Sequence, residues 1–195
     1  MTPPQRYLAL GDSFTIGTGT TPDRSFPAVL VALWRKRGRQ VALTNPAVNG
    51  YTTEELIARE LPFVLRVRPT VVTLLIGSND IVRGSDADRY RARLRSIHTA
   101  LLDAGVTARA IHALPQPDWS LSPSAQLFGD QHALRSSIDA FNAVAREEVE
   151  RIGGTFIDLF PLMRDQADQG KLAPDRLHPS AEAYAEWATA LVDRL

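Results

Sequence analysis

Short apolar segments alternate with longer amphipathic stretches along almost the whole of this 195-residue sequence. Residues 70–76, TVVTLLI, form a nearly continuous apolar run rich in β-branched residues, which is typical of a strand covered on both faces. The other segments expected to form strands are residues 6–10, 40–44, 107–113 and 153–158. Because strands that alternate with helices build parallel sheets, this pattern predicts a parallel sheet with helices on both faces.

Apolar residues at helical spacing mark the stretches between these segments. The expected helices are residues 25–37, 53–66, 86–104, 134–151 and 179–194. The last of them opens with Pro179, a residue favoured in the first helical turn. Residues 114–133 and 159–178 lack a regular pattern and are expected to be long loops, which often carry function. We therefore expect one α/β domain over residues 1–195, with three α/β/α layers and a five-stranded parallel sheet in the flavodoxin-like order 2-1-3-4-5.

Composition and charge argue against several classes of function. The 22 Lys and Arg residues balance the 22 Asp and Glu residues, so no net field attracts nucleic acid or an anionic membrane. The arginines within 86–104 are expected to form a solvated face; they are Arg89, Arg91, Arg93 and Arg95. The chain has no Cys, which excludes thiol and disulfide chemistry. Neither a run of 18 apolar residues nor a signal peptide occurs, so we expect no integral membrane segment and a cytoplasmic location.

Polar segments follow the expected strands at the points where the strands end. The segments after the first three strands read GDSFTIGTG, NPAVNGYTT and GSNDIVRG, and the last long loop ends in PDRLHPSAEAY. Ligands of parallel α/β sheets bind beyond the carboxyl ends of the strands. We therefore expect residues from all four segments at one edge of the sheet, namely Ser13, Gly50, Asn79, Asp175 and His178.

These residue types match the needs of acyl transfer by a serine. Ser13 supplies a hydroxyl nucleophile, His178 a base, and Asp175 a carboxylate three residues before that base. The backbone N–H groups of Ser13 and Gly50 and the side-chain amide of Asn79 are donors suited to an oxyanion. Taken singly, each has a structural alternative, because serine and asparagine often cap turns and helices, and loops often carry single acids and histidines.

The four segments resemble the sequence blocks of the GDSL esterase/lipase family, also called SGNH hydrolases. GDSFTIGTG resembles the first block, VNGYTT the second, GSND the third and DRLHPSAEAY the last, in family order. The resemblance implies a triad of Ser13, Asp175 and His178, and an oxyanion hole of Ser13, Gly50 and Asn79. The resemblance covers nearly the whole chain. The order Ser…Asp…His also occurs in α/β-hydrolases, but their G-x-S-x-G elbow is absent from this sequence.

The expected substrate pocket contains Phe14, Ile81 and Trp119, which follow the first, third and fourth strands. Phe14 stands where the family's name-giving block has Leu, so it can change the shape of the pocket. The alternative is that these side chains only pack the loops onto the core. No Cys, HExxH motif or helical pair of histidines is present, so we expect neither a metal ion nor a cofactor.

The expected function is a serine esterase that hydrolyses carboxylic esters of small or medium acyl chains through an acyl-enzyme. Its partner is a small-molecule or lipid-like ester, and the resemblance allows lysophospholipase, thioesterase, aryl esterase and carbohydrate O-acetylesterase activity. Acyl transfer to an alcohol is an alternative, because it uses the same intermediate. A flavodoxin-like binding domain for a nucleotide or flavin is another, although no GxGxxG or Walker motif occurs. A third is an inactive relative that only binds, and the oligomeric state is open.

Overall fold

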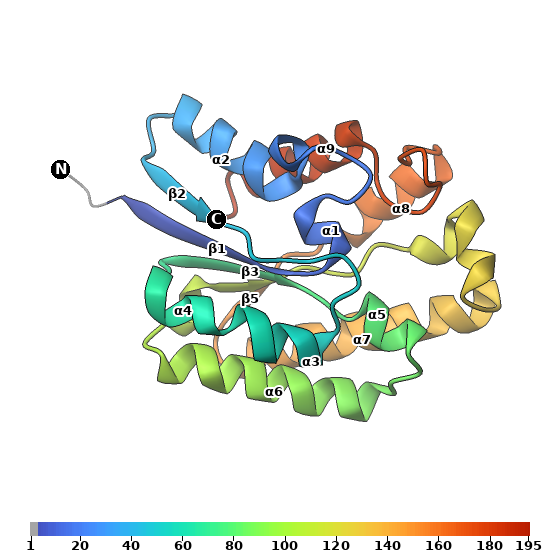
Figure 1. The fold of residues 1–195 in the computed structure, drawn as a ribbon, viewed down its shortest axis with the longest axis horizontal. Helices are drawn as coiled ribbons and strands as arrows, with labels where there is room; N and C mark the ends of the chain where they lie inside the picture. Colours follow the sequence, from blue (N-terminus) through green and yellow to red (C-terminus); the bar gives the residue numbers. More distant parts are fainter. Residues whose placement is uncertain (1–3) are drawn as a thin grey trace.

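A parallel sheet of five strands lies at the centre of the protein, in the order β2-β1-β3-β4-β5 (Figure 1). The computed structural model describes residues 4–195. The strands are β1 (Gln5–Gly11), β2 (Val41–Thr44), β3 (Val71–Leu75), β4 (Ile111–Ala113) and β5 (Thr155–Phe156). The predicted strand order 2-1-3-4-5 is therefore confirmed.

Helices cover both faces of this sheet. The helices are α1 (Ser13–Ile16), α2 (Phe26–Lys36), α3 (Thr53–Glu55), α4 (Pro62–Val67), α5 (Ser78–Val82), α6 (Ala87–Asp103), α7 (Gln131–Arg151), α8 (Phe160–Asp168) and α9 (Ala181–Leu191). Figure 1 shows α2, α8 and α9 on one face, and α4, α6 and α7 on the other. The predicted three-layer α/β/α architecture is confirmed. In the described part of the chain, no helix has both the length and the apolar character needed to cross a bilayer.

Side chains of β1 alternate between the two halves of the core. Tyr7 and Ala9 belong to the apolar cluster that contains residues of α2 and α9. Leu8 and Leu10 belong to the opposite cluster, with residues of α6 and α7. All four are fully buried, because successive residues of a strand point to opposite faces and both faces are covered here.

Three expected elements are shorter or less regular than the sequence suggests. The expected strand 153–158 is reduced to the two residues of β5. The expected strand 107–113 is reduced to β4, because the 3₁₀ turn η3 (Ala108–Ala110) precedes it. The expected helix 53–66 is divided into α3, a π-helical turn η2 (Leu56–Glu60) and α4. The division falls just before Pro62, which lacks the N–H needed to continue the regular pattern.

The long segment 159–178 is not irregular throughout, because α8 occupies its first half. Pro161 lies in the first turn of this helix and Gly170 follows its end, which are local signals of a helix. The helix expected to open at Pro179 begins two residues later, at Ala181. Its N-cap is Ser180, whose side chain accepts a hydrogen bond of 3.2 Å from a backbone N–H.

The segment 114–133 holds the short 3₁₀ turns η4 (Trp119–Leu121) and η5 (Pro123–Leu127), and its last three residues begin α7. The residues of this segment lie beyond the carboxyl ends of the strands, at the same end of the sheet as α1 and α5 (Figure 1). The prediction of a long loop at the functional edge therefore agrees with the structure.

Three of the four arginines between residues 89 and 95 of α6 form ion pairs across the surface. Glu148 on α7 is buried, and it accepts hydrogen bonds from Arg91 and Arg95 at 3.0 Å and from Arg151 at 2.7 Å. Burial opposes the ionisation of Glu148, but the arginines hold its pKa at about 2. Arg93 pairs with an acidic side chain of α3 at 3.2 Å. Arg89 and Arg95 are exposed and Arg91 and Arg93 are half-buried, which agrees with the predicted solvated face; Arg91, Arg93 and Arg95 also join α6 to neighbouring elements.

Candidate active site

Ser13 stands at the carboxyl end of the first strand, two residues after β1 ends at Gly11. Between them, Asp12 caps α1, because its Oδ1 accepts a hydrogen bond of 3.0 Å from the N–H of Phe14. Ser13 is therefore the first residue of α1, and it is 5% exposed. In the described part of the chain its backbone N–H has no acceptor, so this donor is available to a ligand.

Asp175 and His178 form a hydrogen-bonded pair in the loop before α9. Oδ2 of Asp175 lies 2.7 Å from Nδ1 of His178, while Oδ1 accepts hydrogen bonds of 3.0 Å from the N–H groups of Leu177 and His178. Burial opposes the ionisation of Asp175, but these N–H donors and the imidazole outweigh it and lower its pKa. Asp175 is therefore an anion that orients the ring and leaves Nε2 for other partners.

The loop that carries this pair is held from two sides. Its turn needs a left-handed residue, and Arg176 takes this conformation with φ of +59°. Ser122 and Ser124 of the long loop donate hydrogen bonds of 3.2 and 2.9 Å to the carbonyls of Leu177 and Asp175. The segment 114–133 thus serves to brace the acid–base pair.

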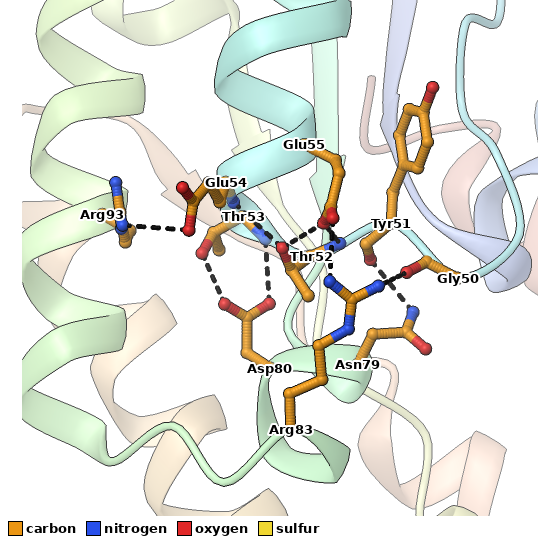
Figure 2. Close-up of polar contacts among 10 residues, drawn as sticks. All are labelled: Gly50, Tyr51, Thr52, Thr53, Glu54, Glu55, Asn79, Asp80, Arg83 and Arg93. Carbon is orange, nitrogen blue, oxygen red and sulfur yellow. Dashed lines mark hydrogen bonds and ion pairs between the residues drawn. The ribbon is translucent and has the colours of Figure 1, made fainter.

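Asn79 and Gly50 come together on neighbouring segments after β2 and β3 (Figure 2). Asn79 lies in the first turn of α5, and its Nδ2 donates one hydrogen bond of 3.0 Å to the carbonyl of Tyr51. The second N–H of this amide has no acceptor among residues 4–195, so it is available to a ligand. Gly50 is the third residue of a turn closed by a 3.2 Å hydrogen bond from the N–H of Tyr51 to the carbonyl of Val48. Its φ is +87°, and within the described residues its N–H has no acceptor.

A cavity of about 250 Å³ joins these segments. Its lining residues are Ser13, Phe14, Asn49, Ser78, Asn79, Val82, Trp119, Phe128, Leu177 and His178. Neither Gly50 nor Asp175 is among these lining residues. Of the lining side chains only the imidazole is titratable, so the cavity suits a neutral ligand. Within residues 4–195, no three His, Cys, Asp or Glu side chains are grouped so as to hold a metal ion.

The structure places two of the three expected pocket residues on this cavity. Phe14 and Trp119 line it, and the ring of Phe14 packs against the imidazole of His178 with centroids 5.3 Å apart. Ile81 is instead partly buried against both halves of the core, and Val82 lines the cavity in its place. Residues three positions apart share a helix face. Once α5 is recognised as a helix, Val82 rather than Ile81 is therefore expected on the same face as Asn79.

Two buried carboxyl groups support the Ser13 turn from beneath. Glu60 accepts a hydrogen bond of 3.0 Å from the N–H of Gly11, while Asp12 binds the next turn. Desolvation raises the pKa of Asp12 to about 7 and that of Glu60 to about 8. Sequence analysis missed Glu60; its only local signal is its position four residues after Leu56, on the apolar side of the expected helix.

Comparisons with known proteins identify a family and a shared fold. The sequence profile of the GDSL-like Lipase/Acylhydrolase family matches residues 9–186. An acetylxylan esterase of Geobacillus stearothermophilus is 25% identical over 96% of this chain and 92% of its own length. An arylesterase of Vibrio mimicus is 24% identical over 59% of this chain, and the chain spans only 58% of that relative.

A solved structure shares the fold at low sequence identity. The psychrotrophic esterase EstA from Pseudoalteromonas sp. superposes with a TM-score of 0.77 at 18% identity, over 97% of this chain and 95% of that one. This likeness bears on the fold alone. The family profile, in contrast, takes in most of the chain, and it shows that this protein belongs to the GDSL-like lipase/acylhydrolase family.

Proposed function

We propose that the protein is a serine esterase that hydrolyses neutral carboxylic esters of small or medium acyl chains. The observation that carries the proposal is the 2.7 Å contact between Asp175 and His178, which places an oriented imidazole on the same cavity as Ser13. A hydroxyl, a base and an acid in this relation are the parts of a catalytic triad.

The proposed reaction proceeds in two half-reactions. Nε2 of His178 takes the proton of the Ser13 hydroxyl as Oγ attacks the ester carbonyl carbon. The tetrahedral intermediate collapses, the C–O bond to the alcohol breaks, and His178 donates its proton to the leaving alcohol. Water then attacks the acyl-enzyme with His178 again as base, and the acid and free Ser13 are released. Asp175 fixes the ring tautomer and stabilises the imidazolium.

Three donors support the assignment of an oxyanion hole beside Ser13. They are the backbone N–H groups of Ser13 and Gly50 and the second amide N–H of Asn79, none of which has an acceptor within the described residues. Free donors that are held in place before the substrate arrives stabilise developing negative charge strongly. Removal of one such donor costs about 10²–10³ in kcat.

The size and lining of the cavity support the substrate class. Its volume of about 250 Å³ is small for a ligand pocket, since ligand sites usually enclose roughly 300–1,000 Å³. Phe14, Trp119 and Leu177 form one wall, and the space of about 20 Å³ behind this wall cannot take a long chain. Similarity to an acetylxylan esterase along almost the whole chain also favours a short acyl group.

A chain-length series of p-nitrophenyl esters, from acetate to dodecanoate, tests both parts of the proposal. We expect kcat/KM to be highest for short acyl chains, and Ser13→Ala to reduce kcat by at least about 10⁴ at every length, because the nucleophile is gone. Full esterase activity of Ser13→Ala would contradict the mechanism. A maximum at dodecanoate would contradict the assigned substrate class and leave the mechanism standing.

A further inference from the structure

Glycine at an oxyanion hole leaves the position of its donor poorly fixed. At Gly50 the backbone has φ of +87° and open space where a Cβ would lie, which allows a ligand to approach closely. The same absence of a side chain makes glycine the most flexible residue, so its N–H needs a restraint from outside. The turn hydrogen bond from Tyr51 to Val48 restrains one side of this turn only.

Arg83 supplies a second restraint on the Gly50 turn (Figure 2). Its Nη2 donates a hydrogen bond of 3.1 Å to the Gly50 carbonyl, and its Nη1 donates one of 2.8 Å to Oε1 of Glu55. The planar guanidinium fork fixes the direction of both bonds, which a point charge would not do. Arg83 itself does not line the cavity, so its guanidinium acts on the site through the Gly50 carbonyl.

Arg83 also belongs to the segment that carries the other side-chain donor. Its backbone N–H caps α5 by a 3.0 Å hydrogen bond to the carbonyl of Asn79, four residues earlier. Residues four apart lie on the same helix face, so Asn79 and Arg83 both reach toward the Gly50 segment. Asn79 holds the Tyr51 carbonyl and Arg83 holds the Gly50 carbonyl, which are consecutive along the chain.

We propose that Arg83 is a positioning residue for the oxyanion hole: through the Gly50 carbonyl it sets the Gly50 N–H relative to the Asn79 amide. This inference rests on the proposed esterase function. According to this inference, helix α5 supplies one donor, the Asn79 amide, and orients another, the Gly50 N–H.

The partner of Arg83 is suited to a permanent restraint. Glu55 closes a capping box at the start of α3, in which its Oε2 accepts a 2.8 Å hydrogen bond from the N–H of Thr52 and another from the Thr52 hydroxyl. Hydrogen bonds lower the pKa of Glu55 to about 2; the largest effect comes from the Thr52 hydroxyl, and the Arg83 guanidinium adds to it. Glu55 is therefore ionised at neutral pH, where the ion pair persists.

Exposure separates a positioning role from a structural one. The side chain of Arg83 is 57% exposed and that of Glu55 33%, and ion pairs this exposed contribute little to stability. We therefore expect Arg83→Ala to leave the melting temperature within about 2 °C. Its kcat should fall about tenfold, while KM should change less than twofold, because the lost restraint acts on the transition state.

Arg93→Ala is the matched control. Arg93 pairs with Glu54 at 3.2 Å and so ties the same short helix α3 to α6, but it makes no contact with Gly50. We expect its kcat to equal that of the wild type. Arg83→Lys, which keeps the charge but meets only one of the two acceptors, should give a kcat between those of the wild type and Arg83→Ala.

The decisive experiment measures kcat, KM and the rate of inactivation by a p-nitrophenyl alkylphosphonate for wild type, Arg83→Ala, Arg83→Lys, Arg93→Ala and Ser13→Ala. The phosphonyl oxygen occupies the oxyanion hole, so inactivation of Arg83→Ala should slow by the same factor as kcat. Wild-type kcat in Arg83→Ala, or an equal loss in Arg93→Ala, would overturn the inference alone. Activity that survives in Ser13→Ala would instead overturn the proposed function.

Discussion

At the scale of single residues, the acid–base pair depends on backbone positions that few side chains tolerate. Asp175 receives two N–H groups from the turn that follows it, and this turn requires Arg176 at φ of +59°. Gly19 packs beneath the same turn, where an added Cβ would lie 2.5 Å from the Cβ of Ala173 and 3.5 Å from Oδ2 of Asp175. The His178 loop therefore rests on a residue that has no side chain.

We expect Gly19→Ala to lower both kcat/KM and stability. Gly19 has φ of +87°, and a left-handed conformation costs an L-residue about 1–2 kcal/mol; the clash with Ala173 adds to this cost and displaces the Asp175 turn. Esterase assays and urea unfolding measure the two effects. Gly38→Ala is the control, because Gly38 has φ of +80° and nothing within 4 Å of a Cβ. Equal losses in the two variants would show that the Gly19 contact is unimportant.

At the scale of elements, the short helices α1 and α5 and the turn before α3 bring the expected site residues to the edge of the sheet. The π-helical turn Leu56–Glu60 directs Glu60 inward to the N–H of Gly11, just before Ser13. Such widened turns often occur at functional sites. Here the turn places a carboxyl group under the Ser13 segment, where it is shielded from water.

Glu60→Gln should make stability less dependent on pH. Desolvation raises the pKa of Glu60 from 4.5 to about 8, so the folded state keeps a proton that the unfolded chain releases. This contribution to stability is complete below about pH 4.5 and is lost as the pH rises toward 8. When the pKa of a group differs by one between the folded and unfolded states, the difference corresponds to about 1.4 kcal/mol.

Glutamine retains the acceptor for the Gly11 N–H and removes the titration. Between pH 5 and pH 9, the free energy of unfolding of the wild type should therefore fall by at least about 1 kcal/mol more than that of Glu60→Gln. This lower bound is smaller than the change that a pKa difference of one would produce. Urea unfolding at these two pH values measures it. Parallel pH profiles for the two proteins would argue against a protonated Glu60.

The elements that sequence analysis predicted well are those with a complete local pattern. The apolar run of β3 and the stripes of α2, α6 and α7 specify burial within a few residues, and their order yields the sheet topology. Glu60 and Arg83 carry no such pattern, because their partners lie 49 and 33 residues away. The pattern of α8 is weaker evidence of a helix because this helix has only 9 residues, and Pro161 and Gly170 are the signals at its ends.

At the scale of the whole molecule, the site lies where the strand order changes direction. The chain leaves β1 for β2 on one side and reaches β3 on the other, and Gly11 is paired with Leu75 at the carboxyl ends of β1 and β3. Ser13 and Asn79 follow these paired residues by two and four positions. Parallel sheets bind ligands at such a switch point, and the topology brings the expected nucleophile and oxyanion donor there.

The central claim is that Ser13 is a nucleophile activated by His178. Reaction of the protein with a fluorophosphonate, followed by peptide mass spectrometry, tests this claim most directly. We predict one covalent adduct per chain, located on Ser13, with labelling lost in Ser13→Ala and strongly slowed in His178→Ala. An adduct on another residue, or no adduct on the folded wild-type protein, would contradict the account.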